Sequence, residues 1–400
     1  MRRFFVLVPI LCGLFAADRG YADATAPPPL AAEAPWAWMS QSASPLPMPD
    51  GRLTDRETEL QRACGVGELG LRRVAERLVQ RKIKELPYLD LDGLTFAQRV
   101  NGEPHVWPRA WIVSARALDH ETTVKKLAAW RTTFHDIGER RCGVASGYAP
   151  DGSQVVAAIA LDAIADLTTP MPVKTHPGTW LTLEARLLVP TTGAHVVLIG
   201  PGGETRTVPT AVDGNVVRAR FALDRPGGFT VQLVSDVTTG PRPALEAQIF
   251  ADVEPPSVMP NLAAPGEAAG VGATDERDAL FRMIAGLRVE QGLRATLRDP
   301  RLDTLAAAHA QRMKDAHTVG HDVGDGDPST RLQRAGLSAH EAGENVAHAQ
   351  TVALAHRALW ASPSHRQNLQ RPEYDRVGIA VLDDADGSVW ACEIFAEDLH

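Results

Sequence analysis

The stretch Gly343-Glu344-Asn345-Val346-Ala347 decides the fold of the C-terminal part of this chain, together with one histidine segment on each side. The earlier segment is Gly320-His321-Asp322, and the later one is Ser362-Pro363-Ser364-His365-Arg366. His321 lies 23 residues before Glu344, and His365 lies 21 residues after it. Such spacings are too long for one helix face or one strand. Only tertiary folding can therefore bring the two imidazoles and the carboxylate together.

Further motifs follow in a fixed order around these segments: Arg331-Leu332, Ala335-Gly336, Trp360, Asn368-Leu369 and Val377-Gly378-Ile379-Ala380-Val381. In this order they resemble the CAP superfamily, the group of cysteine-rich secretory, antigen 5 and pathogenesis-related 1 proteins. The resemblance covers about residues 275–400 and is strongest to the bacterial SCP-domain type. It implies an α-β-α sandwich with a central cleft where two histidines and acidic side chains converge.

The resemblance assigns His321 to the first family histidine, Glu344 to the acid of the Gly-Glu-Asn motif and His365 to the second histidine. The family's second glutamate has no match, because Ala361-Ser362-Pro363 follows Trp360. Asn345 and Ser364 complete the expected ligand cleft. Two imidazoles and a carboxylate can bind Zn²⁺ or another divalent metal with water in the fourth position. They can equally act as an acid/base pair, with no cofactor.

The sequence supports a serine nucleophile and a zinc-protease helix less well. Ser364 is next to His365 in sequence, and adjacent residues rarely adopt the geometry of a nucleophile and its base. We therefore expect Ser362 and Ser364 to cap the helix that carries His365. The run from His340 to Glu344 begins like a zinc-protease helix but has Glu344 where the second histidine belongs.

The remaining C-terminal histidines carry less signal. His309 lies on an apolar helical face and is expected to be a core residue with satisfied ring nitrogens. No fixed-spacing partner accompanies the others, which are expected at the surface: His317, His340, His348 and His356. His400 is terminal and carries no signal.

The C-terminal sequence changes from helical to strand periodicity. An apolar stripe from Ala279 to Leu287 follows a possible cap at Thr274, and Asp299-Pro300 predicts a second helix start. A third helix is expected at about residues 351–361. The runs 377–381 and 389–395, joined by an Asp386-Gly387 turn, predict a hairpin. Helices followed by a hairpin indicate an α+β fold for residues 275–400.

Two other domains are expected before it. Residues 171–253 alternate apolar and polar side chains between turn signals, which predicts an immunoglobulin-like antiparallel β-sandwich. Within residues 54–170, the stretch 141–159 aligns without gaps to residues 376–394 at an offset of 235, and Arg141-Cys142-Gly143 matches Arg376-Val377-Gly378. The hypothesis is a diverged CAP-like domain that kept its packing and lost its site. The alternative is a chance similarity between two hairpins.

The segments between these domains are rich in Pro, Ala and Gly. Residues 25–53 and 254–274 are expected to be extended, solvated linkers. Residues 1–24 have the basic, apolar and small-residue parts of a secretory signal peptide. Export would allow a Cys64–Cys142 disulfide, which the sequence leaves open, while Cys392 is expected to be a buried thiol.

The overall composition narrows the function. The chain has 400 residues, with 41 Lys and Arg against 49 Asp and Glu, giving a net charge of −8. This charge gives no basic field for nucleic acid, and no apolar run is long enough to span a membrane. The expected protein is exported, whether secreted, periplasmic or on the cell surface, and its oligomeric state is open.

Three functions fit this reading. The preferred one is a non-enzymatic or cryptically enzymatic protein whose His/Glu cleft binds a small ligand, lipid, glycan or peptide, with or without a divalent metal. The alternatives are a metal-dependent hydrolase that uses His321, Glu344 and His365, and a structural or adhesion surface protein with a vestigial cleft.

Overall fold

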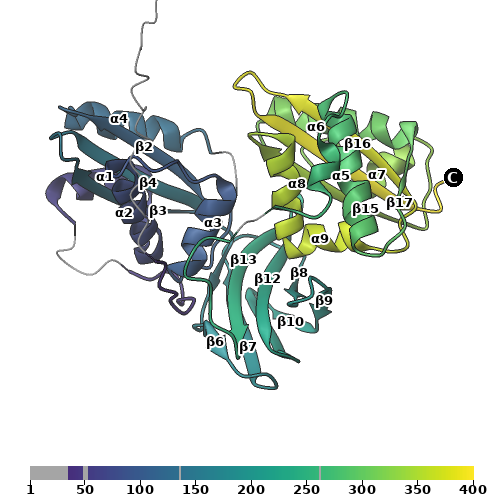
Figure 1. Cartoon of the computed structure of the whole chain (residues 1–400), viewed down its shortest axis with the longest axis horizontal. Coiled ribbons are helices and arrows are strands. Elements are labelled where there is room, and N and C mark those ends of the chain that lie inside the picture. The colour runs from purple at the N-terminus through teal and green to yellow at the C-terminus, as the bar shows by residue number, and fades with distance from the viewer. Residues whose placement is uncertain (1–34, 48–52, 135–136, 261–262) are drawn as a thin grey trace, which may run out of the picture. The chain divides into compact units, whose positions relative to one another are not determined.

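The computed structural model describes residues 35–47, 53–134, 137–260 and 263–400 (Figure 1). The expected signal peptide and most of the first linker lie outside these residues. Within them, four β-sheets account for the strands with assigned partners. One sheet belongs to the N-terminal part of the chain, two form a β-sandwich and one belongs to the C-terminal domain.

The C-terminal domain is an α-β-α sandwich, as predicted. Its sheet has the order β14-β16-β17-β15, with β17 antiparallel to both neighbours. One face packs against α5, α8 and α9, and the other packs against α6 and α7. The elements are α5 (Glu276–Glu290), β14 (Leu297–Arg298), α6 (Pro300–Ala316), α7 (Pro328–Arg334), β15 (Glu341–Ala349), α8 (Val352–Ala361), α9 (Pro363–Gln370), β16 (Arg376–Asp383) and β17 (Val389–Glu397).

The helix starts follow from short polar side chains that accept backbone N–H groups. Asp299 caps α6 with Pro300 in the first turn, as predicted, and Thr351 caps α8. The expected cap at Thr274 is wrong by one residue. Asp275 accepts the N–H of Asp278, while the Thr274 backbone N–H bonds the Asp278 side chain. A carboxylate competes better than a hydroxyl for the positive helix end.

The N-terminal domain repeats the strand order of the C-terminal domain. Its sheet runs β1-β3-β4-β2, with β1 parallel to β3 and the other pairs antiparallel, as in the C-terminal sheet. Between Arg131 and Glu139 the described residues contain no counterpart of α9. The elements are α1 (Asp55–Cys64), β1 (Val66–Gly67), α2 (Leu69–Ile83), α3 (Leu91–Val100), β2 (Arg109–Ala115), α4 (His120–Arg131), β3 (Glu139–Tyr148) and β4 (Gln154–Ala163).

The strand registers also agree at the offset of 235. Gly143 pairs with Ile159 in the first sheet, and Gly378 pairs with Ile394 in the last. Both glycines lie under the start of a helix, because an added Cβ would lie 2.0 Å from the Arg72 nitrogen or 2.2 Å from the Leu302 carbonyl carbon. This agreement supports a shared architecture over a chance similarity.

The first domain lacks the acid of the C-terminal site. Ile394 pairs with Glu344 across β17 and β15, whereas Ile159 pairs with Ala110 across β4 and β2. The domain is instead held by a disulfide between Cys64 and Cys142, which the sequence left open. Cys392, the third cysteine of the described residues, is a buried free thiol, as expected.

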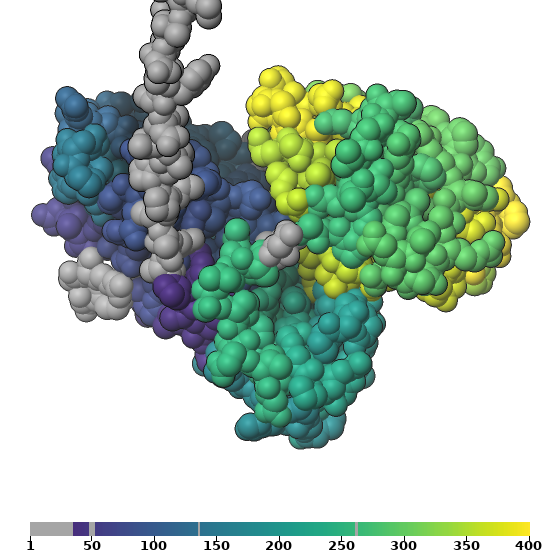
Figure 2. Space-filling view, viewed as in Figure 1, coloured from purple at the N-terminus to yellow at the C-terminus, as the bar shows by residue number. Residues whose placement is uncertain are grey.

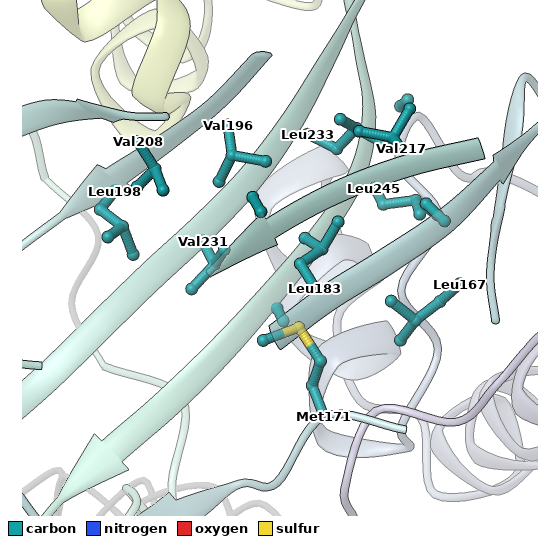
Figure 3. Close-up of a cluster of buried hydrophobic side chains, with 14 of the residues drawn as sticks. Leu167, Met171, Leu183, Val196, Leu198, Val208, Val217, Val231, Leu233 and Leu245 are labelled. Atoms are coloured by element: carbon teal, nitrogen blue, oxygen red, sulfur yellow. The ribbon is translucent and has the colours of Figure 1, made fainter. Parts of the chain in front are cut away.

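The middle domain is a β-sandwich whose two sheets enclose one apolar core (Figure 3). The sheets have the orders β10-β11-β7-β5 and β6-β13-β12-β8-β9. The strands are β5 (Ala165–Leu167), β6 (Lys174–Thr175), β7 (Trp180–Leu187), β8 (Gly193–Ile199), β9 (Thr205–Val208), β10 (Thr210–Asp213), β11 (Val216–Ala222), β12 (Gly227–Val237) and β13 (Gly240–Ala251). The immunoglobulin-like detail stays a prediction.

Two details of the predicted sandwich are wrong. β5 pairs with β7, so the sandwich begins before residue 171. β6 pairs with β13 in parallel, so the second sheet is mixed rather than antiparallel. Both short strands lie at sheet edges, where two or three residues give too weak a periodicity to be recognised in the sequence.

The described parts of the two linkers are solvated in part, as expected for Val258 and Val271, but they also pack on the domains at individual residues. Trp36 is buried with Phe96 in the first core. In the second linker, the 3₁₀ helix η1 (Glu267–Gly270) follows Pro265, whose carbonyl accepts a hydrogen bond from His356. Proline favours an extended backbone, but it does not prevent that backbone from packing on a domain. Among the described residues, no helix has the length and apolarity to cross a bilayer.

The shared architecture predicts matched effects at equivalent glycines. Gly143→Ala and Gly378→Ala should each lower the free energy of unfolding by about 3 kcal/mol, because the added Cβ overlaps helix backbone. Gly152→Ala and Gly387→Ala, at the two equivalent hairpin turns, have open space and should cost only about 1 kcal/mol for their positive φ. Urea unfolding measures all four. Tolerance at either Gly143 or Gly378 would contradict the equivalence.

Candidate functional site

Glu344 lies at the centre of a buried polar cluster in the C-terminal domain. It projects from β15 and is almost fully buried. Its Oε1 is 2.9 Å from His321 Nδ1, and its Oε2 forms an ion pair with the Arg331 guanidinium. Strand alternation places Glu344 on the same face as Val346, toward α6 and α7. The site therefore depends on strand β15 and not on a zinc-protease helix.

A second set of contacts fixes the loop that carries His321. Arg331 Nη1 donates to the carbonyls of His321 and Gly326 at 2.7 and 2.5 Å. His309 is a buried, satisfied histidine, as expected, with Nδ1 2.8 Å from Asp325 and Nε2 2.9 Å from the Gly320 carbonyl. The sequence motif containing Arg331 thus holds both the carboxylate and the loop.

The charges around Glu344 keep it ionised. Burial opposes ionisation, but the hydrogen bond and charge of His321, with the charges of His309 and Arg331, outweigh burial and lower the Glu344 pKa. Each carboxylate oxygen already has a strong partner. Glu344 is consequently a paired structural anion rather than a free base or metal ligand.

His365 lies beside this cluster on helix α9. Burial, together with the charge of His321, lowers the pKa of His365 to about 3, so its ring is neutral at pH 7. Its Nδ1 lies 2.8 Å from the Ser362 hydroxyl. The capping role expected for both serines is therefore wrong in part. Ser362 is the N-cap residue, but its hydroxyl contacts His365 and makes no cap bond, and Ser364 lies inside the helix.

Asn345 connects the helix of His365 to the sheet. Its Nδ2 donates to the His365 carbonyl at 3.2 Å and to Glu393 Oε2 at 3.0 Å. Its Oδ1 accepts from Asn368 at 2.9 Å. The Asn-Leu motif after His365 thus has a structural role. Asn345 positions His365 through the backbone of α9.

Glu393 is a buried acid that the sequence analysis missed. It lies on β17, is fully buried, and has no partner for Oε1 in the described structure. Burial raises the pKa of Glu393 to about 8, against the opposing effect of the Asn345 hydrogen bond. One signal was available, because a single carboxylate interrupts the otherwise apolar run Val389–Ala396.

The surface positions expected for the other histidines are confirmed except for one residue. His317, His340 and His348 are exposed, as expected. His356 is buried instead, because its ring packs beneath the second linker and bonds the Pro265 carbonyl. The error follows from treating that linker as solvated.

A cavity of about 770 Å³ reaches both site histidines. Its walls come from three parts of the chain. The C-terminal domain contributes Gly320, His321, Val346, His365 and Trp390; the sandwich contributes Pro241, Arg242 and Pro243; and the N-terminal domain contributes Trp107, Pro108 and Trp130. Glu344, Asn345 and Ser364 are not among its walls. The cavity combines aromatic and proline surfaces with charged side chains and four imidazoles, because His317 and His348 line it together with His321 and His365.

The three residues expected to bind zinc do not form a ready ligand set. Among residues 35–47, 53–134, 137–260 and 263–400, no group of three or more His, Cys, Asp or Glu side chains is placed to hold a metal ion. The Glu344 carboxylate is held by a guanidinium, and His321 directs Nδ1 to that carboxylate. A cation would have to displace Arg331. The chemistry of the donors therefore does not fit a resident metal.

One family model matches the C-terminal domain. Residues 281–394 match the family model described as CAP: Cysteine-rich secretory protein family. Among solved structures, an outer surface protein from Borrelia burgdorferi is 21% identical, with coverage of 31% of this chain and 93% of that chain and a TM-score of 0.29. No curated protein matches the chain by sequence.

Two further solved structures cover more of the chain. An extracellular protein containing an SCP domain from Bacillus anthracis is 16% identical, with 54% of this chain and 82% of that chain covered and a TM-score of 0.29. A cysteine-rich secretory protein from Staphylococcus aureus is 13% identical, with 68% of this chain and 90% of that chain covered and a TM-score of 0.27.

The raised pKa of Glu393 predicts a pH-dependent gain in the Glu393→Gln variant. The unfolded carboxyl ionises near pH 4.5 and the folded one near pH 8, so the wild type loses stability as pH rises between these values. Gln should increase the free energy of unfolding at pH 7 by roughly 3 kcal/mol, and by almost nothing at pH 4. Urea unfolding at both pH values measures this. Exposed Glu373→Gln is the control, and an equal gain at both pH values would contradict the argument.

The ion pair of Glu344 predicts strong coupling with Arg331. Arg331→Met should lower the free energy of unfolding by about 3–5 kcal/mol, because it leaves a buried carboxylate without its cation. Adding Glu344→Gln should recover at least half of that loss, since the variant then buries a neutral amide. A double-mutant cycle by urea unfolding measures the coupling. Simple additivity would show that the two side chains do not depend on each other.

Proposed function

Because residues 281–394 form a CAP domain, the domain of the cysteine-rich secretory protein family, we propose that this chain binds a small ligand in the cavity beside His321 and His365. The carrying observation is one cavity of about 770 Å³ that contains both imidazoles, which is within the usual range for small-molecule sites. A lipid, a glycan and a peptide are the ligand classes that the family resemblance suggests.

The site histidine favours recognition by hydrogen bonds, and the cavity wall also carries charged side chains that could pair with a ligand: Asp90, Asp92, Arg109, Arg242, Asp384 and Asp386. The neutral His365 ring can offer one donor or acceptor, since its pKa lies far below 7. Arg331 already neutralises Glu344, so neither group is available to a charged ligand. Trp107, Trp130 and Trp390 supply aromatic wall surface.

Hydrolysis is the less supported function. The metal-dependent version requires a ligand set that the donors of the described residues do not form. The acid/base version requires a carboxylate free to move a proton, and Glu344 is committed to Arg331 and His321. A non-enzymatic binding protein agrees better with these contacts.

We further propose that the chain is exported. The N-terminal signal-like segment supports this, as does the Cys64–Cys142 disulfide. Disulfides persist in oxidising compartments and are rare in the cytosol. The CAP-domain structures from B. anthracis and S. aureus carry the words extracellular and secretory in their names.

Binding can be tested with Prodan, an uncharged fluorophore whose emission reports entry into an apolar cavity. The full chain should bind it saturably. Leu354→Trp, in the cavity wall on α8, should weaken binding at least tenfold because the indole fills the space. Ala361→Trp adds the same group at an exposed position of the same helix and should leave binding unchanged. Absence of saturable binding would favour a structural protein with a vestigial cleft.

A further inference from the structure

The hairpin β12–β13 of the sandwich reaches the His321 loop of the CAP domain. Val237 pairs with Gly240, so the strands are joined by the two-residue turn Thr238-Thr239. The register shifts between Leu233 and Val234, an irregularity that bends a hairpin and redirects its tip. The sandwich also contacts the CAP domain. Figure 2 shows teal atoms of the sandwich against yellow-green atoms of the CAP domain, and the Ser364 N–H donates to the Gln232 side chain.

The tip makes backbone hydrogen bonds of the kind that bind a peptide carbonyl. The Thr239 carbonyl accepts from the N–H of His321 at 2.8 Å and from the N–H of Asp322 at 3.1 Å. Two successive N–H groups directed at one oxygen form a small concave donor site. This site recognises main chain, and any extended peptide can offer the same carbonyl.

The residue after that carbonyl is restricted to glycine. Gly240 has φ +98°, which disfavours other residues, and an added Cβ would lie 2.6 Å from His321 Cβ. The same Cβ would lie 3.2 Å from two atoms of the imidazole ring. Pro241 follows and lines the cavity. The hairpin therefore places a carbonyl, a glycine and a proline in succession against His321.

The body of the hairpin also contacts the segment of His365. Gln232 Oε1 accepts from the Ser364 N–H at 3.2 Å, and Gln232 Nε2 donates to the Ser362 hydroxyl at 3.4 Å. That hydroxyl is the partner of His365 Nδ1. One hairpin thus contacts the surroundings of both site histidines.

We propose that Thr239-Gly240-Pro241 is an internal ligand of the CAP cavity, and that the external ligand is an extended peptide carrying the same carbonyl–glycine–proline chemistry. This proposal rests on the proposed function. A tethered occupant competes at an effective concentration of about millimolar order. It lowers the apparent affinity for a free peptide in proportion to the fraction of molecules with an open cavity.

The test uses the peptide acetyl-Thr-Thr-Gly-Pro-Arg-Pro-amide, which copies residues 238–243, and calorimetry on the full chain. Gly240→Ala should release the tip and bind the peptide at least tenfold more tightly than the wild type. Gly178→Ala is the matched control, because Gly178 has φ +80° in the same domain and open space around it. It should bind like the wild type. The peptide with Val in place of Gly should not bind.

Hydrogen exchange on the wild type gives a second test that needs no variant. Saturating peptide should accelerate exchange at Val237 and Gly240, whose paired backbone closes the tip, while His321 and Asp322 stay protected by the new carbonyl. If peptide binds neither Gly240→Ala nor the wild type while Prodan still binds, the internal-ligand proposal is overturned and the cavity function stands. If Prodan also fails to bind, both proposals fall.

Discussion

The structure of the site depends on the burial of one ionised carboxylate. Glu344 comes from β15, the strand of the CAP sheet that borders α7, and its charge must be compensated away from water. Arg331 supplies that compensation from α7, and His321 supplies it from the preceding loop. Because Arg331 also bonds the backbone of the His321 loop, one guanidinium joins helix, loop and strand.

This arrangement separates the roles of the three residues that the family pattern highlights. Glu344 is a buried structural centre, and His321 links that centre to the cavity. His365 is a neutral cavity residue held by Ser362 and, through its backbone, by Asn345. Of these three residues, the two histidines face the space where a ligand could bind. Within this set of three residues, Glu344 thus stabilises the packing, and the two histidines are placed for ligand recognition.

The N-terminal domain shows which parts of the architecture need the site and which do not. It keeps the strand order, the registers and the close helix–glycine contact, while Ala110 stands where the C-terminal domain has Glu344. It also lacks a counterpart of α9 among its described residues. It contains a disulfide, an apolar core and buried ion pairs of its own, such as Arg131 with Asp162. The shared strand order therefore does not require an acid at the position of Glu344.

The sequence by itself determined the elements whose signal is local. Strand alternation and the Asp299-Pro300 helix start depend on neighbours within a few residues, and they predicted helices followed by a hairpin. The α-β-α layers were instead implied by the family resemblance of the ordered motifs around Glu344. The offset of 235 between two hairpins likewise required no knowledge of packing. The buried thiol of Cys392 followed from the apolar strand around it.

Only the tertiary structure decided which groups share a charge, a cavity or a partner. Glu393 is a buried acid with no cationic partner for its carboxyl group among the described residues, and His356 is a core residue. Both are buried because segments distant in sequence cover them. Because Glu344 pairs with Arg331, the three residues expected to bind zinc do not form a ready ligand set. The hairpin that bonds the His321 backbone comes from the sandwich, which is a different domain. Desolvation and ion pairing depend on three-dimensional surroundings, which no local pattern of residues encodes.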